Sequence, residues 1–207
     1  AGAAPEAPAR PRGLASATSV SEGIARPENQ ARLAGLLNDA ALVTVRHKAD
    51  AETLAGWGVR GVHVASDLGY LAEPAPYALL PPAPGRKRLL LVPRFHWNDN
   101  MFEVARLVQE RLADAVQFHA MAMSIEDVPA VESLLRGGRF PLSSVWDFRY
   151  PSVAEARRAC GEADVVWTEK FHGALFARAG GTPCFTTTRS YKIRNEIGES
   201  CVVAFSV

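Results

Sequence analysis

Hydrophobic positions in the C-terminal part of the chain alternate between two periods. Short apolar runs, such as RLLLVP at 88–93, predict buried strands, and apolar residues spaced three and four positions apart predict helices. The predicted strands are 88–93, 115–119, 143–148, 164–167, 184–187 and 201–205, and the predicted helices are 100–113, 124–135, 152–160, 170–179 and 190–197. Ser152 and Glu155 form the S-x-x-E pattern of a helix-capping box. This regular alternation predicts a Rossmann-like α/β fold, a doubly wound parallel sheet with helices on both faces.

A shorter stretch of the same kind precedes it. Leu33, Leu36 and Leu37 share one face of a helix that begins near Glu28, and the run ALVTVR at 41–46 predicts a strand. We expect Asp50 to cap a second helix that ends at Gly58, before a strand at 61–65. The stretch therefore predicts part of a second Rossmann-like domain.

Two segments of unusual composition set the expected domain bounds. Residues 1–27 begin with alternating Ala and Pro and hold few large apolar side chains, which predicts a flexible tail. Residues 74–87 contain five prolines between Pro74 and Pro84, which predicts an interdomain linker. We therefore expect a partial N-terminal α/β domain at 28–73 and a C-terminal Rossmann-like donor-binding domain at 88–207. The chain does not begin with Met, which fits a processed protein or a fragment of a longer one.

Charge and cysteine content narrow the function classes. The chain has 23 Lys and Arg against 22 Asp and Glu, a net charge of +1, which argues against general nucleic-acid binding. Its three cysteines are far apart and form no C-x-x-C pair, so we expect neither a disulfide framework nor a zinc site. With no secretory signal and no apolar run of membrane-spanning length, we expect a cytoplasmic protein.

Candidate chemistry gathers where predicted strands meet the following helices, because parallel sheets bind ligands at the carboxyl ends of their strands. Arg94 follows the strand at 88–93, and its planar guanidinium suits a phosphate or carboxylate. The run TEKFHGAL at 168–175 places Lys170 and His172 at a helix N-terminus, which favours anions. Gly173 follows and permits close backbone approach. The loop at 186–194 adds Thr, Arg and Lys side chains and Tyr191.

Each of these features also has a structural interpretation. Arg94 could be a surface residue that caps a loop, His172 could be a core histidine, and the loop at 186–194 could be a solvated polar segment. Glu126 and Asp127 are explained by the helix dipole alone, because acids are favoured in a first helical turn. The sequence contains no G-x-G-x-x-G motif and no P-loop, and its histidines lack metal-ligand spacing, so we expect no metal site.

The residues from 163 to 199 resemble the C-terminal signature of the polysaccharide pyruvyl transferase family. That signature has a Ser-Arg-hydrophobic-His-Ala-like turn, then a Gly-x-Pro turn and a loop with Tyr and Lys. His172 matches the histidine, Lys170 stands where Arg is usual, and Tyr191 and Lys192 match the Tyr and Lys. Gly181-Thr182-Pro183 matches the Gly-x-Pro turn. Residues 43–71 resemble a second family segment, in which Arg46 and Asp67 match and His47 replaces an acid. Arg94 matches an Arg common after the first strand of the second domain.

The resemblance covers about residues 28–199 and implies a GT-B-like arrangement with a truncated N-terminal domain. It implies transfer of a pyruvyl group from phosphoenolpyruvate to two hydroxyls of a glycan acceptor, which gives a cyclic ketal and phosphate. In that assignment His172 is catalytic, and Arg94, Lys170, Tyr191, Lys192 and Arg46 bind substrate, with no metal or cofactor besides the co-substrate. Two alternatives remain, a GT-B nucleotide-sugar glycosyltransferase and a non-catalytic anion- or glycan-binding remnant. The acceptor and the oligomeric state are left open.

Overall fold

The structure, a computed structural model, describes residues 14–17, 24, 26–71, 84–95, 99–112, 114–136, 142–146, 152–187, 190–198 and 201. It divides the chain into two compact units, Ala1–Leu68 and Gly69–Val207. The first is unit 1 and the second is unit 2 throughout. The segment 72–83, which includes most of the expected linker, lies outside the described residues.

Unit 1 is a small parallel α/β unit. Its elements are β1 (Leu14–Ala17), α1 (Pro27–Asn38), β2 (Leu42–Val45), α2 (Lys48–Gly56) and β3 (Val62–Val64). The strands form one parallel sheet in the order β1-β2-β3. Val43 and Val45 point to the same side of β2 and are buried with Ala34 of α1 and Leu54 of α2. Unit 1 therefore has a parallel α/β arrangement, and the expected bounds of the domain stay a prediction.

Two expectations for unit 1 are corrected. The segment expected to be a flexible tail contains β1, whose four residues pair with β2 from Leu14↔Leu42 to Ala17↔Val45. The helix cap expected at Asp50 lies three residues earlier, at His47, and Asp50 is instead a buried residue of the first turn of α2. The expected helix end is close to the observed one, since Gly58 follows α2 with a φ of +87°.

Unit 2 holds a five-stranded parallel sheet in the order β6-β5-β4-β7-β8. Its strands are β4 (Lys87–Val92), β5 (Val116–Met121), β6 (Leu142–Trp146), β7 (Val165–Thr168) and β8 (Cys184–Phe185). Its α-helices are α3 (Asp99–Leu112), α4 (Val128–Arg136), α5 (Val153–Glu162), α6 (Phe171–Ala179) and α7 (Tyr191–Ile197), and the turns η1 (Leu68–Leu71) and η2 (Ile125–Asp127) are 3₁₀ helices. The strand expected at 201–205 lies outside the described residues except for Cys201.

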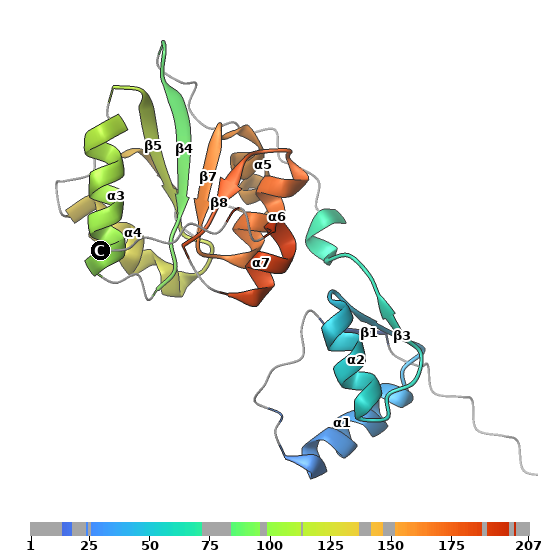
Figure 1. Ribbon diagram of the computed structural model, residues 1–207. Coiled ribbons are helices and arrows are strands. Elements are labelled where there is room, and N and C mark those ends of the chain that lie inside the picture. Colours follow the sequence, from blue (N-terminus) through green and yellow to red (C-terminus); the bar gives the residue numbers. More distant parts are fainter. Residues whose placement is uncertain are drawn as a thin grey trace, which may run out of the picture. The chain divides into compact units, whose positions relative to one another are not determined.

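Alternate residues of the central strand β4 enter two separate cores. Leu89 and Leu91 pack on one face with residues of α3 and α4, whereas Leu90 and Val92 pack on the other face with residues of α5 and α6. Figure 1 shows the same layers, with α3 and α4 on one side of the sheet and α5 and α6 on the other. A strand buried on both faces needs a continuous apolar run, which explains why RLLLVP has no polar alternation.

Local signals in the sequence have their expected counterparts in unit 2. Ser152 and Glu155 make both hydrogen bonds of the predicted capping box at the start of α5. The close packing of α5 on α6 depends on small residues, because a Cβ added to Gly180 would lie 2.5 Å from the Cα of Gly161. This contact fixes the position of α6, which carries part of the candidate site.

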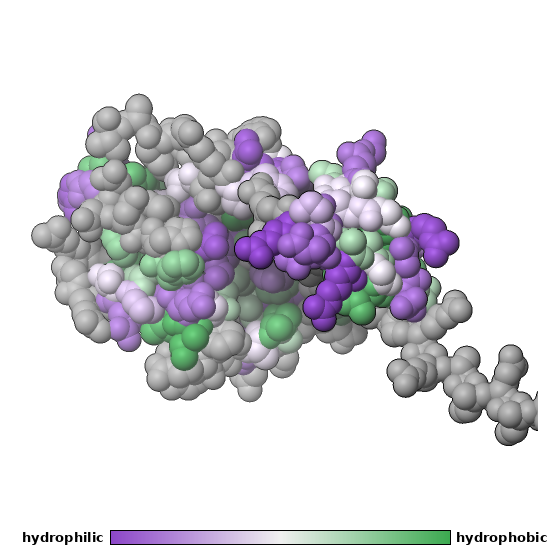
Figure 2. Space-filling model, turned by 90° about the horizontal axis from the view of Figure 1, so that it is seen from below, coloured by the Kyte–Doolittle hydropathy of each residue, from purple (hydrophilic) through white to green (hydrophobic). Residues whose placement is uncertain are grey.

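On the face seen in Figure 2, the apolar residues among those that the structure describes form small patches between hydrophilic ones. Large apolar side chains that are exposed come from separate elements, for example Leu36, Leu71, Phe95, Ile125 and Val153. Within the described part of the chain, none of the helices has the length and apolar character needed to cross a bilayer.

Candidate functional site

Three neighbouring strands bring the predicted residues to one edge of the unit 2 sheet. Strand β4 pairs directly with β7, with Val92 opposite Thr168, and Arg94 and Lys170 each follow two residues later. The backbone N–H of Glu169 donates to the carbonyl of Val92 at 2.9 Å, which holds the two strand ends together. The expected shared edge for Arg94 and the TEKFHG segment is therefore confirmed.

A buried carboxylate, Asp127, links these strand ends to the segment after β5. Its side chain is fully buried, with Oδ1 accepting the backbone N–H of Phe95 at 3.1 Å and Oδ2 accepting the hydroxyl of Ser124 at 2.6 Å. The ammonium of Lys170 lies 2.8 Å from the same Oδ2, and it also donates to Ser124 Oγ at 3.2 Å. We call Asp127, Ser124, Lys170 and Phe95 the carboxylate network. It joins the carboxyl ends of β4, β5 and β7.

The carboxylate network changes the interpretation of two residues. Asp127 was explained by the helix dipole alone, but its burial and three partners show that it organises the strand ends. Lys170 was expected to bind an anionic ligand, and the structure shows that its charge is compensated by Asp127. Its side chain is 20% exposed, so Lys170 is not sealed from solvent as Asp127 is.

Arg94 differs from Lys170 in its surroundings. Its side chain is half-buried, and its guanidinium carbon lies 5.6 Å from the centre of the Phe95 ring, a cation–π contact. Among the described residues, no carboxylate forms an ion pair with Arg94, in contrast to Lys170 and Arg46. Arg94 is therefore a cation at this edge that has no ion-pair partner among the described residues.

The start of α6 carries His172 on the surface. His172 is exposed in the first turn of α6, so the alternative of a core histidine is wrong. Its ring lies edge-on to Phe171 at 5.4 Å and tilted over Phe176 at 6.0 Å between ring centres. These contacts orient the imidazole at the helix N-terminus, where the helix dipole favours negative charge.

Gly173 does permit a close approach, but the partner belongs to the protein. A Cβ at this position would lie 2.2 Å from Thr168 Oγ1, 3.0 Å from Thr168 Cβ and 3.4 Å from a methyl carbon of Val92. The absence of a side chain therefore lets α6 start directly against β7. His172 therefore follows the last residue of β7, Thr168, by only four residues.

A second buried acid, Glu169, binds the loop that follows β8. Its Oε1 accepts the indole N–H of Trp167 at 3.0 Å, the backbone N–H of Thr187 at 2.9 Å and the hydroxyl of Thr187 at 2.6 Å. Its Oε2 accepts the hydroxyl of Thr186 at 3.2 Å. The loop at 186–194 is thereby held against the end of β7, as its position after the neighbouring strand predicted.

Tyr191 and Lys192 open α7, four and five residues after Thr187. Tyr191 is exposed and Lys192 is half-buried. Arg189 lies outside the described residues. The assignment of Tyr191 and Lys192 to substrate binding stays a prediction.

Arg46 lies in unit 1, where it forms an ion pair with Asp67. The guanidinium and the carboxylate are 2.7 Å apart, and their side chains are 8% and 5% exposed. The two residues matched the family pattern together, and the structure shows them as direct partners that join the end of β2 to the segment after β3. The role of Arg46 in substrate binding stays a prediction.

Sequence analysis missed both Asp127 and Glu169 as parts of the site. A signal exists for each: Ser124 and Asp127 follow the strand AVQFHAMAM within a few residues, and Glu169 comes directly after the buried strand that ends at Thr168. An acid at the carboxyl end of a buried parallel strand cannot remain buried without donors, so it indicates a hydrogen-bonded network.

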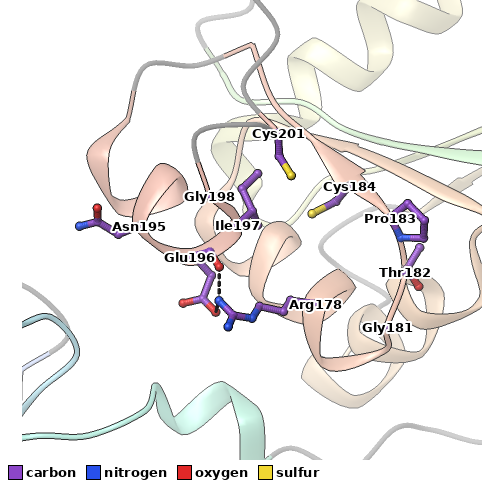
Figure 3. A pocket seen from close by; sticks show the side chains of 10 residues that line it. All are labelled: Arg178, Gly181, Thr182, Pro183, Cys184, Asn195, Glu196, Ile197, Gly198 and Cys201. Carbon is purple, nitrogen blue, oxygen red and sulfur yellow. Dashed lines mark hydrogen bonds and ion pairs between the residues drawn. The ribbon is translucent and has the colours of Figure 1, made fainter.

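A hollow of about 600 Å³ lies elsewhere, beside the amino end of β8. Its lining comes from the ends of α6 and α7 and from the turn before β8 (Figure 3). Arg178 and Glu196 form an ion pair there at 3.5 Å. Cys184 also lines the hollow, and burial raises the pKa of its thiol to about 11. The hollow opens at the opposite end of the strands from Arg94 and Lys170, so it is separate from the candidate site.

Fold and site together define a Rossmann-like α/β protein with cationic and acid–base side chains at the carboxyl ends of its central strands. The family model of polysaccharide pyruvyl transferases matches residues 7–191, and the chain belongs to this family. No curated protein matches the sequence. The resemblance to this family is thereby confirmed.

Solved structures share the fold at low sequence identity. One is the Glycosylation Associate Protein (Gap123) complex from Streptococcus agalactiae, with a TM-score of 0.56 and 10% identity over 86% of this chain and 38% of that chain. Another is the pneumococcal O-GlcNAc transferase GtfA in complex with UDP and GlcNAc, with a TM-score of 0.56 and 13% identity over 93% of this chain and 41% of that chain. The expected fold class is confirmed. The chain corresponds to less than half the length of these two structures.

Proposed function

We propose that this chain transfers a pyruvyl group from phosphoenolpyruvate to two hydroxyls of a sugar in a glycan. Membership of the polysaccharide pyruvyl transferase family supports glycan modification. The observation that supports the proposal is the direct pairing of β4 with β7, because the segments that carry Arg94 and Lys170 follow these two strand ends. No metal or cofactor is part of the proposed reaction besides the co-substrate.

The donor has two anionic groups, a phosphate and a carboxylate, and the proposed site offers the guanidinium of Arg94 and the N–H groups of Lys170 to bind them. The planar fork of Arg94 suits bidentate contact with one of these groups. Lys170 offers a directed N–H from the start of α6, where the helix dipole adds a favourable potential. Tyr191 and Lys192 are further proposed contacts, and Arg46 is proposed as a substrate contact on its family match alone.

The proposed chemistry needs proton transfer at a site open to solvent. Protonation of the methylene carbon of the donor gives an oxocarbenium-like carbon, and a sugar hydroxyl attacks that carbon and loses its proton. Phosphate then leaves with one proton, and the second hydroxyl closes the ketal. Of the two hydroxyl protons, one balances the new methyl group and one the released phosphate. His172 is the proposed proton carrier, because histidine titrates near neutral pH and lies exposed at the helix start.

A nucleotide-sugar glycosyltransferase is the second candidate. The fold similarity to a structure in complex with UDP and GlcNAc favours it, although a likeness at 13% identity concerns the fold alone. A non-catalytic anion- or glycan-binding protein is the other alternative.

The test compares ligands by thermal unfolding of the full chain. Phosphoenolpyruvate at about 100 times its Kd should stabilise the fold by roughly 2.7 kcal/mol, and UDP should do less. A shift with UDP and none with phosphoenolpyruvate would support the glycosyltransferase instead. With a glycan acceptor, the wild type should release phosphate. His172→Ala should keep its fold and lose this release, whereas a binding protein would show donor stabilisation without release in either variant.

A further inference from the structure

We infer that Asp127 is a positioning residue that sets both donor-binding cations at once, Lys170 through its side chain and Arg94 through the backbone of Phe95. The inference rests on the proposed use of this edge as a donor site. It assigns a function to the carboxylate network, whose acid is fully buried while its lysine still reaches solvent.

The first step concerns the hydrogen bonds that Lys170 has left to give. An ammonium has three N–H donors. Asp127 Oδ2 at 2.8 Å and Ser124 Oγ at 3.2 Å accept two of them. One N–H of the ammonium remains, and its direction is fixed because the other two are held by Asp127 and Ser124. Lys170 therefore acts as an oriented hydrogen-bond donor whose charge is compensated by Asp127, and Arg94 is the cation without an ion-pair partner among the described residues.

The second step concerns the other oxygen of the same carboxylate. Asp127 Oδ1 accepts the N–H of Phe95 at 3.1 Å, and Phe95 directly follows Arg94. A hydrogen bond to a carboxylate is stronger than one between neutral groups, so it restrains the turn that carries Arg94. One side chain thus holds the ammonium of Lys170 and the backbone next to Arg94, which follow different strands.

Positioning and simple electrostatics predict opposite results for Asp127→Asn. Removal of a negative charge beside a site for an anion should tighten anion binding if only net charge matters. If position matters, binding should weaken, because an amide can replace only one carboxylate oxygen. If the amide oxygen faces Lys170, the NH₂ group faces the N–H of Phe95, and two hydrogen-bond donors meet. In the other orientation, the NH₂ group faces the ammonium of Lys170, and two donors meet there instead.

Glu126 offers a matched control from the same turn. It is exposed and lies next to Asp127 in η2, so Glu126→Gln removes the same charge from the same helix start without touching the carboxylate network. Glu126→Gln therefore shows how much the loss of one negative charge from this turn changes binding while the carboxylate network stays intact.

The experiment measures the Kd of phosphoenolpyruvate for the full chain by calorimetry, together with hydrogen exchange of the Phe95 amide. Asp127→Asn should raise the Kd about tenfold to a hundredfold, the loss expected for a charge-assisted hydrogen bond. It should also speed exchange at Phe95. Glu126→Gln should change the Kd less than about twofold, since an exposed charge is screened, and should leave the exchange unchanged.

Unchanged or tighter binding by Asp127→Asn would overturn the inference. If that variant does not fold, Ser124→Ala carries the test, because it removes the hydroxyl that bonds both Asp127 and Lys170 and leaves both charges. It should weaken donor binding several-fold, and an unchanged Kd would again overturn the inference. A wild type that binds no phosphoenolpyruvate would refute the proposed function and the positioning of its donor together. If the wild type binds phosphoenolpyruvate, and Asp127→Asn and Ser124→Ala both leave its Kd unchanged, the positioning alone is refuted.

Discussion

The contact between Gly173 and Thr168 leads to a sharp prediction about the start of α6. A Cβ at position 173 would lie 2.2 Å from Thr168 Oγ1, well inside van der Waals contact. Thr168 is fully buried, and its Oγ1 is held by the backbone of Lys170, donating to the carbonyl at 2.9 Å and accepting the N–H at 3.0 Å. The hydroxyl can move away only if these bonds are lost.

The magnitude for Gly173→Ala follows from three opposed effects. Overpacking of a close-packed core costs about 1–3 kcal/mol. Loss of the two hydrogen bonds of Thr168 adds about 1–2 kcal/mol, and the higher helix propensity of Ala returns up to about 1 kcal/mol. We expect a net loss of about 2–3 kcal/mol in the free energy of unfolding, or a melting temperature lower by roughly 5–10 °C.

Urea denaturation of the full chain measures this loss, and Gly161 supplies the control within the same unit. A Cβ on Gly161 in α5 would meet its nearest neighbour at 3.6 Å, an ordinary contact, so Gly161→Ala should be neutral or slightly stabilising. In a Thr168→Ala background, Gly173→Ala should cost about 1 kcal/mol less, because the hydroxyl is gone. If Gly173→Ala unfolds at the same urea concentration as Gly161→Ala, or shows no coupling to Thr168, the steric argument is wrong.

The sequence predicted the layers of unit 2 well because they depend on short-range patterns. A strand buried on both faces must be apolar throughout, as in RLLLVP, and the capping box at Ser152 needs only residues three positions apart. The carboxyl ends of parallel strands also share one edge whatever their order, so the meeting of Arg94 with the Lys170 segment followed from topology. The direct pairing of β4 with β7 could not be predicted in this way, because the order of the strands in the sheet depends on the direction that each crossover connection takes.

What the sequence did not predict depends on partners far along the chain. The strand β1 reads LASA, with small side chains and no apolar run, and it is a strand because β2 offers it a paired edge. Asp127 looks like any acid in a first helical turn until Lys170, from another strand, is placed against it. Gly173 suggested room for a ligand, but the room is taken by Thr168. In each case the local sequence is compatible with two different environments, and only the contacts made in the folded chain decide between them.

Two further variants test the strand ends. Arg94→Lys should weaken phosphoenolpyruvate binding nearly as much as Arg94→Ala, about tenfold to a hundredfold by calorimetry, because Lys cannot reproduce a bidentate contact; an Arg94→Lys protein with wild-type affinity would rule that contact out. Glu169→Ala should destabilise the fold by about 2–4 kcal/mol in urea denaturation, because it leaves the buried indole N–H of Trp167 and the donors of Thr186 and Thr187 without their acceptor. Glu169→Gln should cost about 1 kcal/mol or less, because an amide oxygen can take the place of Oε1 and its three donors, while the hydroxyl of Thr186 can turn to accept from the new NH₂. Equal losses for the two Glu169 variants would show that the negative charge, and not the number of acceptors, holds the loop after β8 against the end of β7.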